Sequence, residues 1–271
     1  MPGTLVIGYG GYGCSCARTY AELHGRPVLL MDYRSFSEDE YTLTQDCIEL
    51  TEDTNLNASR IRNVMEGYRS VLLLSPIGGG SFETAHSLIS ECARSLDLPM
   101  ISLCTIPYSF ESERRSKALE SLASLPESVD NVFVIDLQRT ISSDAATENF
   151  QDYLERTGII VADLMKILSD MMDTIPFSSY CSSPVYTISI GSGIPLAEAV
   201  SDALAHPYFD IVPGCGKVLI FTESDVSQFD MEQAVSLLSA HSNALPEYVG
   251  RAAIGKNSVL LFIPISFRQT L

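Results

Sequence analysis

Two glycine-rich turns constrain the fold of this chain more than any other feature, because each stands between a short apolar run and a helix-like stretch. The first spans residues 8–13 and follows the run 4–8, and the second spans residues 78–81 and follows the run 71–75. Short apolar runs without alternation are typical of strands that are buried on both faces of a parallel sheet. The sequence therefore predicts an α/β fold in which two strand–turn–helix units can face one ligand from two sides.

The rest of the chain predicts two domains joined by a long helix. Strand-like and helix-like segments alternate through the first half, which is the pattern of a doubly wound parallel sheet. Polar residues 35–57 predict loops with a short helix, and residues 148–172 predict the long helix. Later segments predict strands at 186–190, 217–221, 251–254 and 258–265, and helices at 195–205 and 231–241. The expected units are a first domain at 1–150, a central helix and loop at 151–183, and a smaller α/β domain at 184–271.

The composition excludes several classes of function. The 271 residues are 46% hydrophobic and 19% charged, so the chain can build a packed core. The net charge of −17 repels phosphate backbones and anionic lipid, so we expect no nucleic-acid partner. No apolar run is long enough to span a bilayer. Seven cysteines without a signal peptide predict reduced thiols and a cytoplasmic location, and no spacing of Cys and His predicts a metal site.

The first turn reads G-x-G-x-x-G, the pattern of a phosphate-binding strand–helix turn, with Gly8, Gly10, Gly11 and Gly13 as its glycines. Glycines there let the backbone approach a pyrophosphate, and the helix N-terminus adds N–H donors and a positive dipole. Asp32 ends the next strand-like run, where a dinucleotide fold places its ribose-binding acid. The motif alone leaves open an NAD-dependent oxidoreductase and a tight turn without a ligand.

The second turn, Gly78, Gly79, Gly80 and Ser81, also ends a strand-like run and begins a helix. Three consecutive glycines at a helix N-terminus form a nest of backbone donors that suits phosphate, and a dinucleotide fold does not need them. A close-packed turn is the alternative interpretation. Two such turns in one sheet favour a phosphate-bearing ligand between them.

A third segment, residues 107–115, follows a strand-like run and reads P-Y-S-F-E-S-E-R-R. With it the chain resembles the tubulin/FtsZ family, specifically FtsZ, in which a glycine-rich first turn is followed by G-G-G-T-G-T-G and then by P-F-x-F-E-G-x-x-R. A strand at 132–136 led in by Asp130, the central helix and G-S-G at 191–193 continue the resemblance in order and spacing. It covers nearly the whole chain and implies a nucleotide-binding, GTPase-like first domain followed by an FtsZ-like C-terminal domain.

The resemblance implies a cleft for GTP or GDP, with Mg²⁺ as the accompanying ion, at the carboxyl ends of the first-domain strands. The residues of the two turns that would line it are Gly8, Gly10, Gly11, Gly13, Ser15, Gly78, Gly79, Gly80 and Ser81. Ser15 stands where FtsZ has an asparagine. Carried over in the same way, Glu111 would bond the ribose, and Arg115 would lie by the sugar or the phosphate.

The resemblance also places guanine against the start of the central helix, near residues 150–152. Asp152 would accept from guanine N1 and N2, and Gln151 aligns as well. No residue is assigned a catalytic role.

The second turn departs from the FtsZ pattern, because its later glycines are lost. Phe82 replaces a glycine and restricts the approach of the backbone, while Glu83 is expected to place a carboxylate near the phosphates. Like charges at that range cost about 1–4 kcal/mol unless they are screened. Ser81 keeps a hydroxyl. We therefore expect nucleotide binding to be weakened or altered.

The segment after the central helix departs further. FtsZ carries N-x-D-x-x-D there and inserts the acids into the pocket of the next subunit, whereas residues 169–179 contain no such motif. Asp173 is the only acid close to the right place, and a solvated helix end is the favoured interpretation of it. Loss of the water-positioning groups predicts slow or absent GTP hydrolysis. The sequence stops at Leu271, so recruitment through a C-terminal membrane-tether peptide and a direct membrane anchor are not expected.

The leading hypothesis is an FtsZ-like protein that binds guanine nucleotide and associates head to tail into a homo-oligomer or filament. The second is a scaffold or regulator of cell division that keeps the fold, binds no nucleotide and pairs with itself or with a true FtsZ. The third is the NAD-dependent oxidoreductase, which leaves the second and third segments unexplained.

Overall fold

The computed structural model describes residues 3–38, 40, 46–79, 82–123, 131–140, 149–176, 180–181, 183, 185–210, 216–241 and 244–265. The described strands are β1 (Thr4–Tyr9), β2 (Val28–Asp32), β3 (Asp46–Glu49), β4 (Ser70–Pro76), β5 (Met100–Ile106), β6 (Val132–Asp136), β7 (Val185–Ser192), β8 (Lys217–Thr222), β9 (Leu245–Arg251) and β10 (Ser258–Pro264). The described helices are α1 (Gly10–His24), α3 (Thr54–Met65), α4 (Phe82–Ser95), α5 (Ser112–Ala123), α6 (Phe150–Thr174), α7 (Leu196–Ala205) and α8 (Gln228–His241), with a 3₁₀ turn η1 (Leu137–Thr140).

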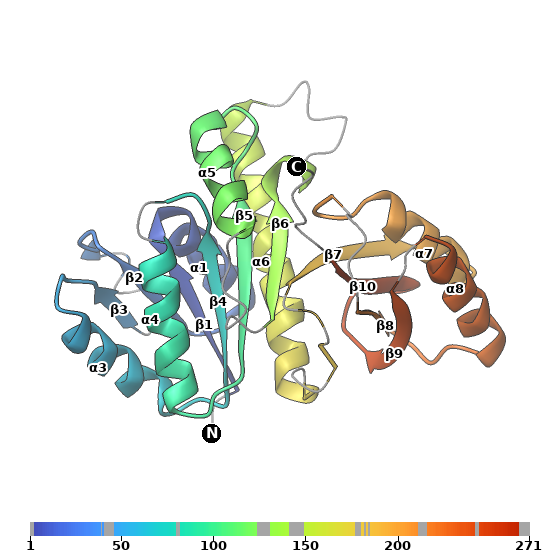
Figure 1. The fold of residues 1–271 in the computed structure, drawn as a ribbon, viewed down its shortest axis with the longest axis horizontal. Helices are drawn as coiled ribbons and strands as arrows, with labels where there is room; N and C mark the ends of the chain where they lie inside the picture. The colour runs from blue at the N-terminus through green and yellow to red at the C-terminus, as the bar shows by residue number, and fades with distance from the viewer. Residues whose placement is uncertain are drawn as a thin grey trace.

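The strands form one sheet in the order β3-β2-β1-β4-β5-β6-β7-β10-β8-β9 (Figure 1). All neighbours from β3 to β7 are parallel, β10 is antiparallel to both β7 and β8, and β9 is parallel to β8. Because β7 pairs with β6 on one side and with β10 on the other, the sheet continues from the first part of the chain into the last part. The α/β fold with a parallel first half is confirmed.

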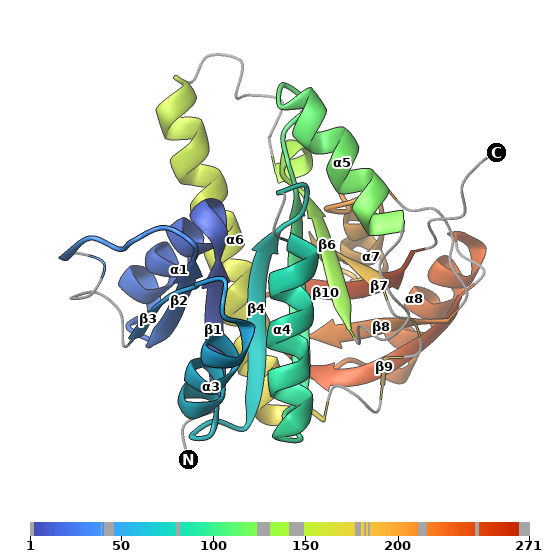
Figure 2. The ribbon, with the colours of Figure 1, turned by 60° about the vertical axis from the view of Figure 1, so that its left-hand side comes forward.

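Helices cover both faces of the first half of the sheet, which explains why its strands read as unbroken apolar runs. Along β1, Leu5 and Ile7 pack in one core cluster with α3 and α4, whereas Val6 packs in the other with α1 and α6. Figure 2 shows α4 on one side of these strands and α1 and α6 on the other. All but the end residues of these strands are buried, so the period of two disappears from the sequence.

The central helix α6 is 25 residues long, from Phe150 to Thr174, close to the expected 148–172. At 1.5 Å per residue it is about 37 Å long. Asn149 caps its first turn by accepting a hydrogen bond from the Asp152 N–H. Its buried residues face α1 and the sheet, so α6 runs from the upper edge of the sheet in Figure 1 to the lower edge.

The last part of the chain is a smaller α/β unit. Helices α7 and α8 pack on one face of β7, β10, β8 and β9, and alternate residues of β8 and β10 pack with α6 in the main core. The expected short strand at 251–254 is wrong, because β9 covers Leu245–Arg251 and is ordered by pairing with β8. The expectation of loops and a short helix at 35–57 missed β3, which pairs with β2. None of the described helices is both long enough and apolar enough to cross a bilayer.

Candidate functional site

The two glycine turns lie side by side at the point where the order of the strands reverses. β1 has β2 on one side and β4 on the other, and Gly8 of β1 is paired with Leu74 of β4. Helix α1 begins directly after β1, and α4 begins a few residues after β4, so both helix N-termini face the upper edge of the sheet (Figure 1). In open parallel sheets the crevice at such a reversal is the usual ligand site. The arrangement expected for the two turns is present.

Three glycines of these turns are required by the packing of the chain itself. A Cβ on Gly8 would lie 2.5 Å from the carbonyl oxygen of Gly13, and a Cβ on Gly13 would lie 2.8 Å from that of Leu74. Gly78 has φ of +90°, and a Cβ there would collide with the carbonyl oxygen of Arg114. A left-handed φ and a close backbone approach both exclude a side chain. These positions would be glycine whether or not a ligand binds.

Two other glycines have no such packing reason. A Cβ on Gly11 or on Gly79 would meet nothing within 4 Å, and neither residue has a positive φ. Ser15 lies four residues after Gly11 on the same exposed face of α1. Gly10 has φ of +70° and stands at the start of the helix. Gly11 and Gly79 therefore leave the backbone of both turns accessible, which is what a phosphate needs for close approach.

The lost glycines of the second turn are accommodated by the protein core. The Phe82 ring is 1% exposed and packs with Ile77 and Ala118 between α4 and α5, so it points away from the crevice. The Glu83 carboxylate, which was expected beside the phosphates, accepts a 2.6 Å hydrogen bond from the Ser121 hydroxyl on α5. Two more of the expected residues, Gly80 and Ser81, lie outside the described residues.

The third segment connects β5 to α5 beside the same edge. Glu111 accepts a hydrogen bond from the Arg114 guanidinium and is partly exposed. Arg115, which the resemblance puts at the sugar or the phosphate, is bonded within the chain. Its guanidinium donates to both carboxylate oxygens of Asp136, at 2.7 and 2.6 Å, and to the carbonyl of Pro107 at 2.7 Å. Hydrogen bonding to Asp136 raises the pKa of Arg115 further above its ordinary value.

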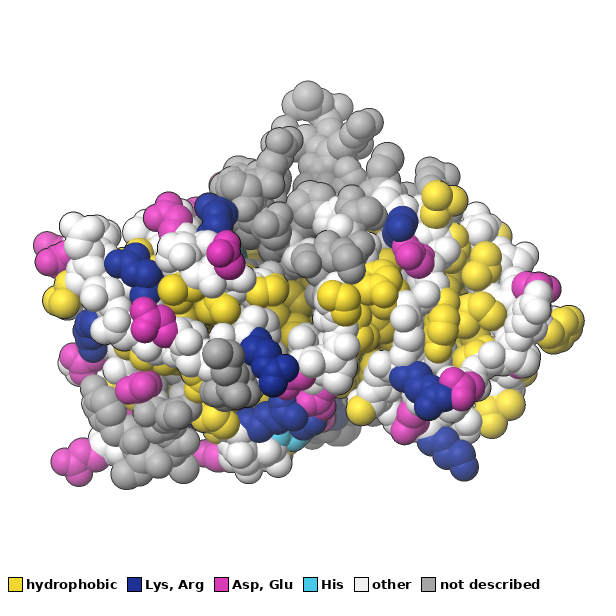
Figure 3. Space-filling model, turned by 90° about the horizontal axis from the view of Figure 1, so that it is seen from below, with side chains coloured by type: hydrophobic (Ala, Val, Ile, Leu, Met, Phe, Trp, Pro, Cys, Tyr) yellow, Lys and Arg dark blue, Asp and Glu magenta, His cyan; other side chains and the backbone are white. Residues whose placement is uncertain are grey.

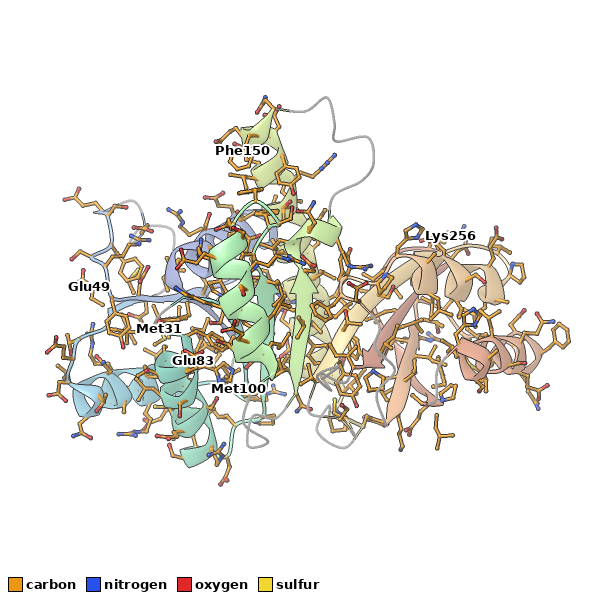
Figure 4. The ribbon with its side chains drawn as sticks, turned by 45° about the horizontal axis from the view of Figure 1, so that its top comes forward. Met31, Glu49, Glu83, Met100, Phe150 and Lys256 are labelled. Atoms are coloured by element: carbon orange, nitrogen blue, oxygen red, sulfur yellow. The ribbon has the colours of Figure 1, made fainter. Side chains whose placement is uncertain are left out.

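An exposed aromatic pair joins this segment to the start of α6. Phe110 and Phe150 are 59% and 57% exposed, and their ring centroids are 5.4 Å apart in an edge-on arrangement. Tyr108 stacks on Phe110 from below at 5.1 Å, and Tyr153 packs against both Tyr108 and Phe150. Figure 4 shows Phe150 at the upper end of α6. The sequence reasoning did not identify this pair, although each ring stands in a segment that the resemblance assigned to the ligand.

The two candidates for recognition of a base edge lie in the first turn of α6. Asp152 accepts from the Asn149 side-chain amide at 2.5 Å, and the Gln151 amide donates to Glu155 at 3.1 Å. Both side chains are exposed and are bonded only to neighbours on their own helix end or cap.

The acid expected for a dinucleotide ribose is engaged by its own loop. The Asp32 carboxylate accepts from the Tyr33 N–H at 2.7 Å and pairs with Arg34 at 3.2 Å. Arg34 also forms two hydrogen bonds with Glu40, and these bonds hold the pKa of Glu40 down at about 2. This cluster disfavours the dinucleotide alternative.

The acidic end of α6 lies at the opposite edge of the sheet from the crevice. Asp170 pairs with Arg26 at 2.5 Å and with Lys166, and Asp173 accepts a hydrogen bond from the Thr4 hydroxyl at 2.9 Å. Asp173 is exposed in the last turn of α6, as the favoured interpretation of a solvated helix end predicts, and it also contacts Thr4. Figure 3 shows basic and acidic side chains next to one another on this lower face. Among the described residues, no group of three or more His, Cys, Asp or Glu could hold a metal ion.

No protein-family model matches the chain. The chain is 28% identical to the cell division protein FtsZ of Pseudomonas aeruginosa over an alignment of 134 positions that covers 41% of this chain and 34% of that protein. Among solved structures it is similar to an empty FtsZ dimer of M. jannaschii, with a TM-score of 0.72, 16% identity, and coverage of 99% and 90% of the two chains. It is also similar to GDP-form protofilaments of Bacillus thuringiensis TubZ, with a TM-score of 0.62, 15% identity, and coverage of 97% and 85%.

The match to the Pseudomonas protein thus spans about a third of that protein's length, whereas the structural similarity extends over nearly all of this chain. The order of the strands, the long helix through the middle of the molecule and these similarities show that the chain has the fold of FtsZ and TubZ.

Proposed function

We propose that this chain is a cytoplasmic FtsZ-like cytoskeletal protein that binds GTP or GDP in the crevice between the β1 and β4 turns and associates with copies of itself. The observation that carries the proposal is the pair of open glycines, Gly11 and Gly79, on turns that lie side by side at the reversal of strand order. The packing of the chain does not demand glycine at either position, and both turns follow neighbouring strands, so one ligand that touches the backbone at this edge would account for both.

The phosphates would be held by main-chain donors, because the crevice lies between the N-termini of α1 and α4. Helix N-termini carry unpaired N–H groups and a partial positive charge. The turn of Glu83 toward Ser121 removes one source of repulsion from this position. With the protein at a net charge of −17, Mg²⁺ would supply the charge that screens the phosphates.

The base would rest on the exposed rings of Phe110 and Phe150. Exposed aromatic rings close to one another are a stacking platform, and stacking on any base is favourable. Specificity for guanine would come from a carboxylate, because Asp152 can accept from the N1–H and N2–H₂ donors that adenine lacks. Gln151 is the other candidate for this contact, and Glu111 would bond the ribose.

Hydrolysis is proposed to be slow or absent. The two acids at the far end of α6, Asp170 and Asp173, are about 30 and 34 Å along the helix from its start and are bonded within the chain. They could act only on the nucleotide of a neighbouring copy. There they would have to give up their contacts with Arg26 and Thr4 before they could position a water molecule. Bound nucleotide would then stabilise the folded or assembled form without being consumed.

Self-association is supported by the similar structures, one described as an FtsZ dimer and another as TubZ protofilaments. In a head-to-tail arrangement the lower face of one copy would cover the crevice of the next. Such a contact grows open polymers unless it closes into a ring. A true FtsZ is the other candidate partner.

The test is a calorimetric titration of nucleotide-free protein with GTP and Mg²⁺. Separate titrations with ATP and with NAD are the controls. We expect saturable binding of GTP alone, and we expect Gly79→Val to abolish it. Gly67→Val is the matched control, since a Cβ on Gly67 also meets nothing within 4 Å, and Gly67 lies between α3 and β4 at the lower edge. Absence of GTP binding up to millimolar concentration would contradict the proposal and favour the nucleotide-free scaffold.

A further inference from the structure

The buried carboxylate of Asp136 is the centre of a hydrogen-bond network that reaches the surface at the segment between β5 and α5. Asp136 ends β6, is 4% exposed, and binds the Arg115 guanidinium through both of its oxygens. One of these oxygens also accepts from the Gln138 N–H at 3.0 Å. A buried charge with a bidentate partner and a backbone donor has a defined position, because any other arrangement would leave it unpaired.

Two arms of this network reach the segment between β5 and α5. Arg115 donates to the Pro107 carbonyl at 2.7 Å. Gln138 accepts from the Ser109 N–H at 3.1 Å and from the Ser109 hydroxyl at 2.7 Å. The residues on either side of Tyr108 are thus linked to Asp136. Pro107 is linked through the Arg115 guanidinium, and Ser109 is linked through Gln138. Tyr108 in turn carries the ring on which Phe110 stacks.

The same residue ties the segment to the C-terminal part of the chain. The Asp136 N–H donates to the Tyr208 carbonyl at 2.6 Å, and the Tyr208 N–H donates to the Ile188 carbonyl of β7 at 3.0 Å. Tyr208 follows α7, so the position of Asp136 depends on the smaller unit as well as on β6.

We infer that Asp136, acting through Arg115 and Gln138, is the positioning residue for the nucleotide-contacting segment 107–111, and that Arg115 does not itself contact the nucleotide. This inference rests on the proposed function. A segment already held in its binding conformation loses less conformational entropy when the ligand arrives. Phe110 and Glu111 follow the anchored residues directly. The anchoring would therefore also restrict their conformations before the ligand binds.

The direct-contact role of Arg115 and the positioning role predict opposite effects of Asp136→Asn. If Asp136 positions the segment, the affinity for GTP falls at least about tenfold, as expected when a charged hydrogen bond is lost. If Arg115 contacts the nucleotide, the substitution frees its guanidinium and affinity is unchanged or higher, which overturns the inference. Gln138→Ala is the second variant. It leaves the ion pair intact, and we expect it to weaken GTP binding severalfold through the loss of the Ser109 contacts.

Arg139→Ala is the matched control, because Arg139 lies one residue further on and bonds to Asp210 and the Pro207 carbonyl without reaching the segment 107–111. We expect its affinity for GTP to stay within twofold of the unsubstituted protein. A loss in Arg139→Ala as large as that in Gln138→Ala would show a general effect of the region and would overturn the inference.

A spectroscopic readout separates failure of this inference from failure of the proposed function. The chain contains no tryptophan, so Phe110→Trp introduces a single reporter in the segment. In this background we expect Asp136→Asn to lower the fluorescence anisotropy of the reporter even without nucleotide. Unchanged anisotropy would overturn the positioning role whether or not GTP binds. If the unsubstituted protein binds no GTP and Asp136→Asn still lowers the anisotropy, the proposed function is contradicted. The conclusion that Asp136 anchors the segment would then still hold.

Discussion

The hydroxyl of Thr4 donates a 2.9 Å hydrogen bond to the carboxylate of Asp173 and so joins the first residue of β1 to the last turn of α6. The two residues are 169 positions apart in the chain. Arg26 extends the contact, since it lies 3.8 Å from Asp173 and forms the closer pair with Asp170. The lower end of the long helix is therefore fixed to the strand that leads into the glycine turn.

This contact leads to the first prediction. Asp173→Ala is expected to lower the free energy of unfolding by about 1 kcal/mol, because it removes a partly exposed charged hydrogen bond. It is expected to leave any residual GTP hydrolysis unchanged. Urea unfolding and a phosphate-release assay check the two parts, with Glu66→Ala as an exposed acidic control. A loss of hydrolysis without a loss of stability would assign Asp173 to catalysis and contradict this interpretation.

The second prediction concerns stability in acid. Hydrogen bonds from Arg34 lower the pKa of Glu40 to about 2, well below the value of about 4.3 in an unfolded chain. As the pH falls, Glu40 therefore takes up its proton in the unfolded chain before it does so in the folded protein. The stabilisation that Glu40 gains from Arg34 is complete above about pH 4.5 and is lost as the pH falls toward 2. We expect a contribution of about 1 kcal/mol, since Arg34 is 43% exposed and screened by solvent.

Urea unfolding at several pH values measures this contribution. Glu40→Gln should make the dependence of unfolding free energy on pH less steep between pH 4.5 and 2. Glu38→Gln, in the same loop, should leave it unchanged. An identical pH dependence in Glu40→Gln and the unsubstituted protein would show that Arg34 does not perturb this carboxyl group.

The third prediction tests the aromatic platform. Phe150→Ala is expected to weaken GTP binding about tenfold, because stacking on an aromatic ring contributes roughly 1–3 kcal/mol per base. The ring is 57% exposed, so its removal should change the melting temperature little. Phe229 on α8 is 66% exposed and far along the chain, and Phe229→Ala is the control whose affinity should not change. Equal affinities for both variants would place the base elsewhere.

The fourth prediction separates packing glycines from open ones. Gly8→Ala should lower the free energy of unfolding by about 1–3 kcal/mol, since its Cβ would lie 2.5 Å from the Gly13 oxygen and 2.6 Å from the Ala17 Cβ. Gly11→Ala, three residues on, should be neutral or stabilising by up to about 1 kcal/mol, because alanine is the better helix former and meets no neighbour. Thermal unfolding of both variants measures the two effects. Equal destabilisation by Gly8→Ala and Gly11→Ala would contradict the distinction between packing glycines and open glycines.

Local features of the sequence determined much of the first half of the fold. Apolar runs flanked by glycine predicted β1 and β4 because burial on both faces and a tight exit to a helix each leave a mark within ten residues. The length of α6 was predicted because apolar residues such as Leu164 and Met171 recur along one face of the helix. β3 was missed because only Cys47 and Ile48 are apolar and buried there, and its strand geometry comes from pairing with β2.

The tertiary structure decided how the candidate site is built. Arg115 and Asp136 are 21 residues apart, and they meet only because β5 and β6 are neighbours in the sheet. The burial of the Phe82 ring also depends on tertiary packing, because the ring contacts apolar residues such as Ala118 of α5. A turn motif is set by residues in contact along the chain, so a sequence can display it. The partner of a charge or a ring depends on which distant segments the packing brings beside it, and that is determined only when the whole sheet is assembled.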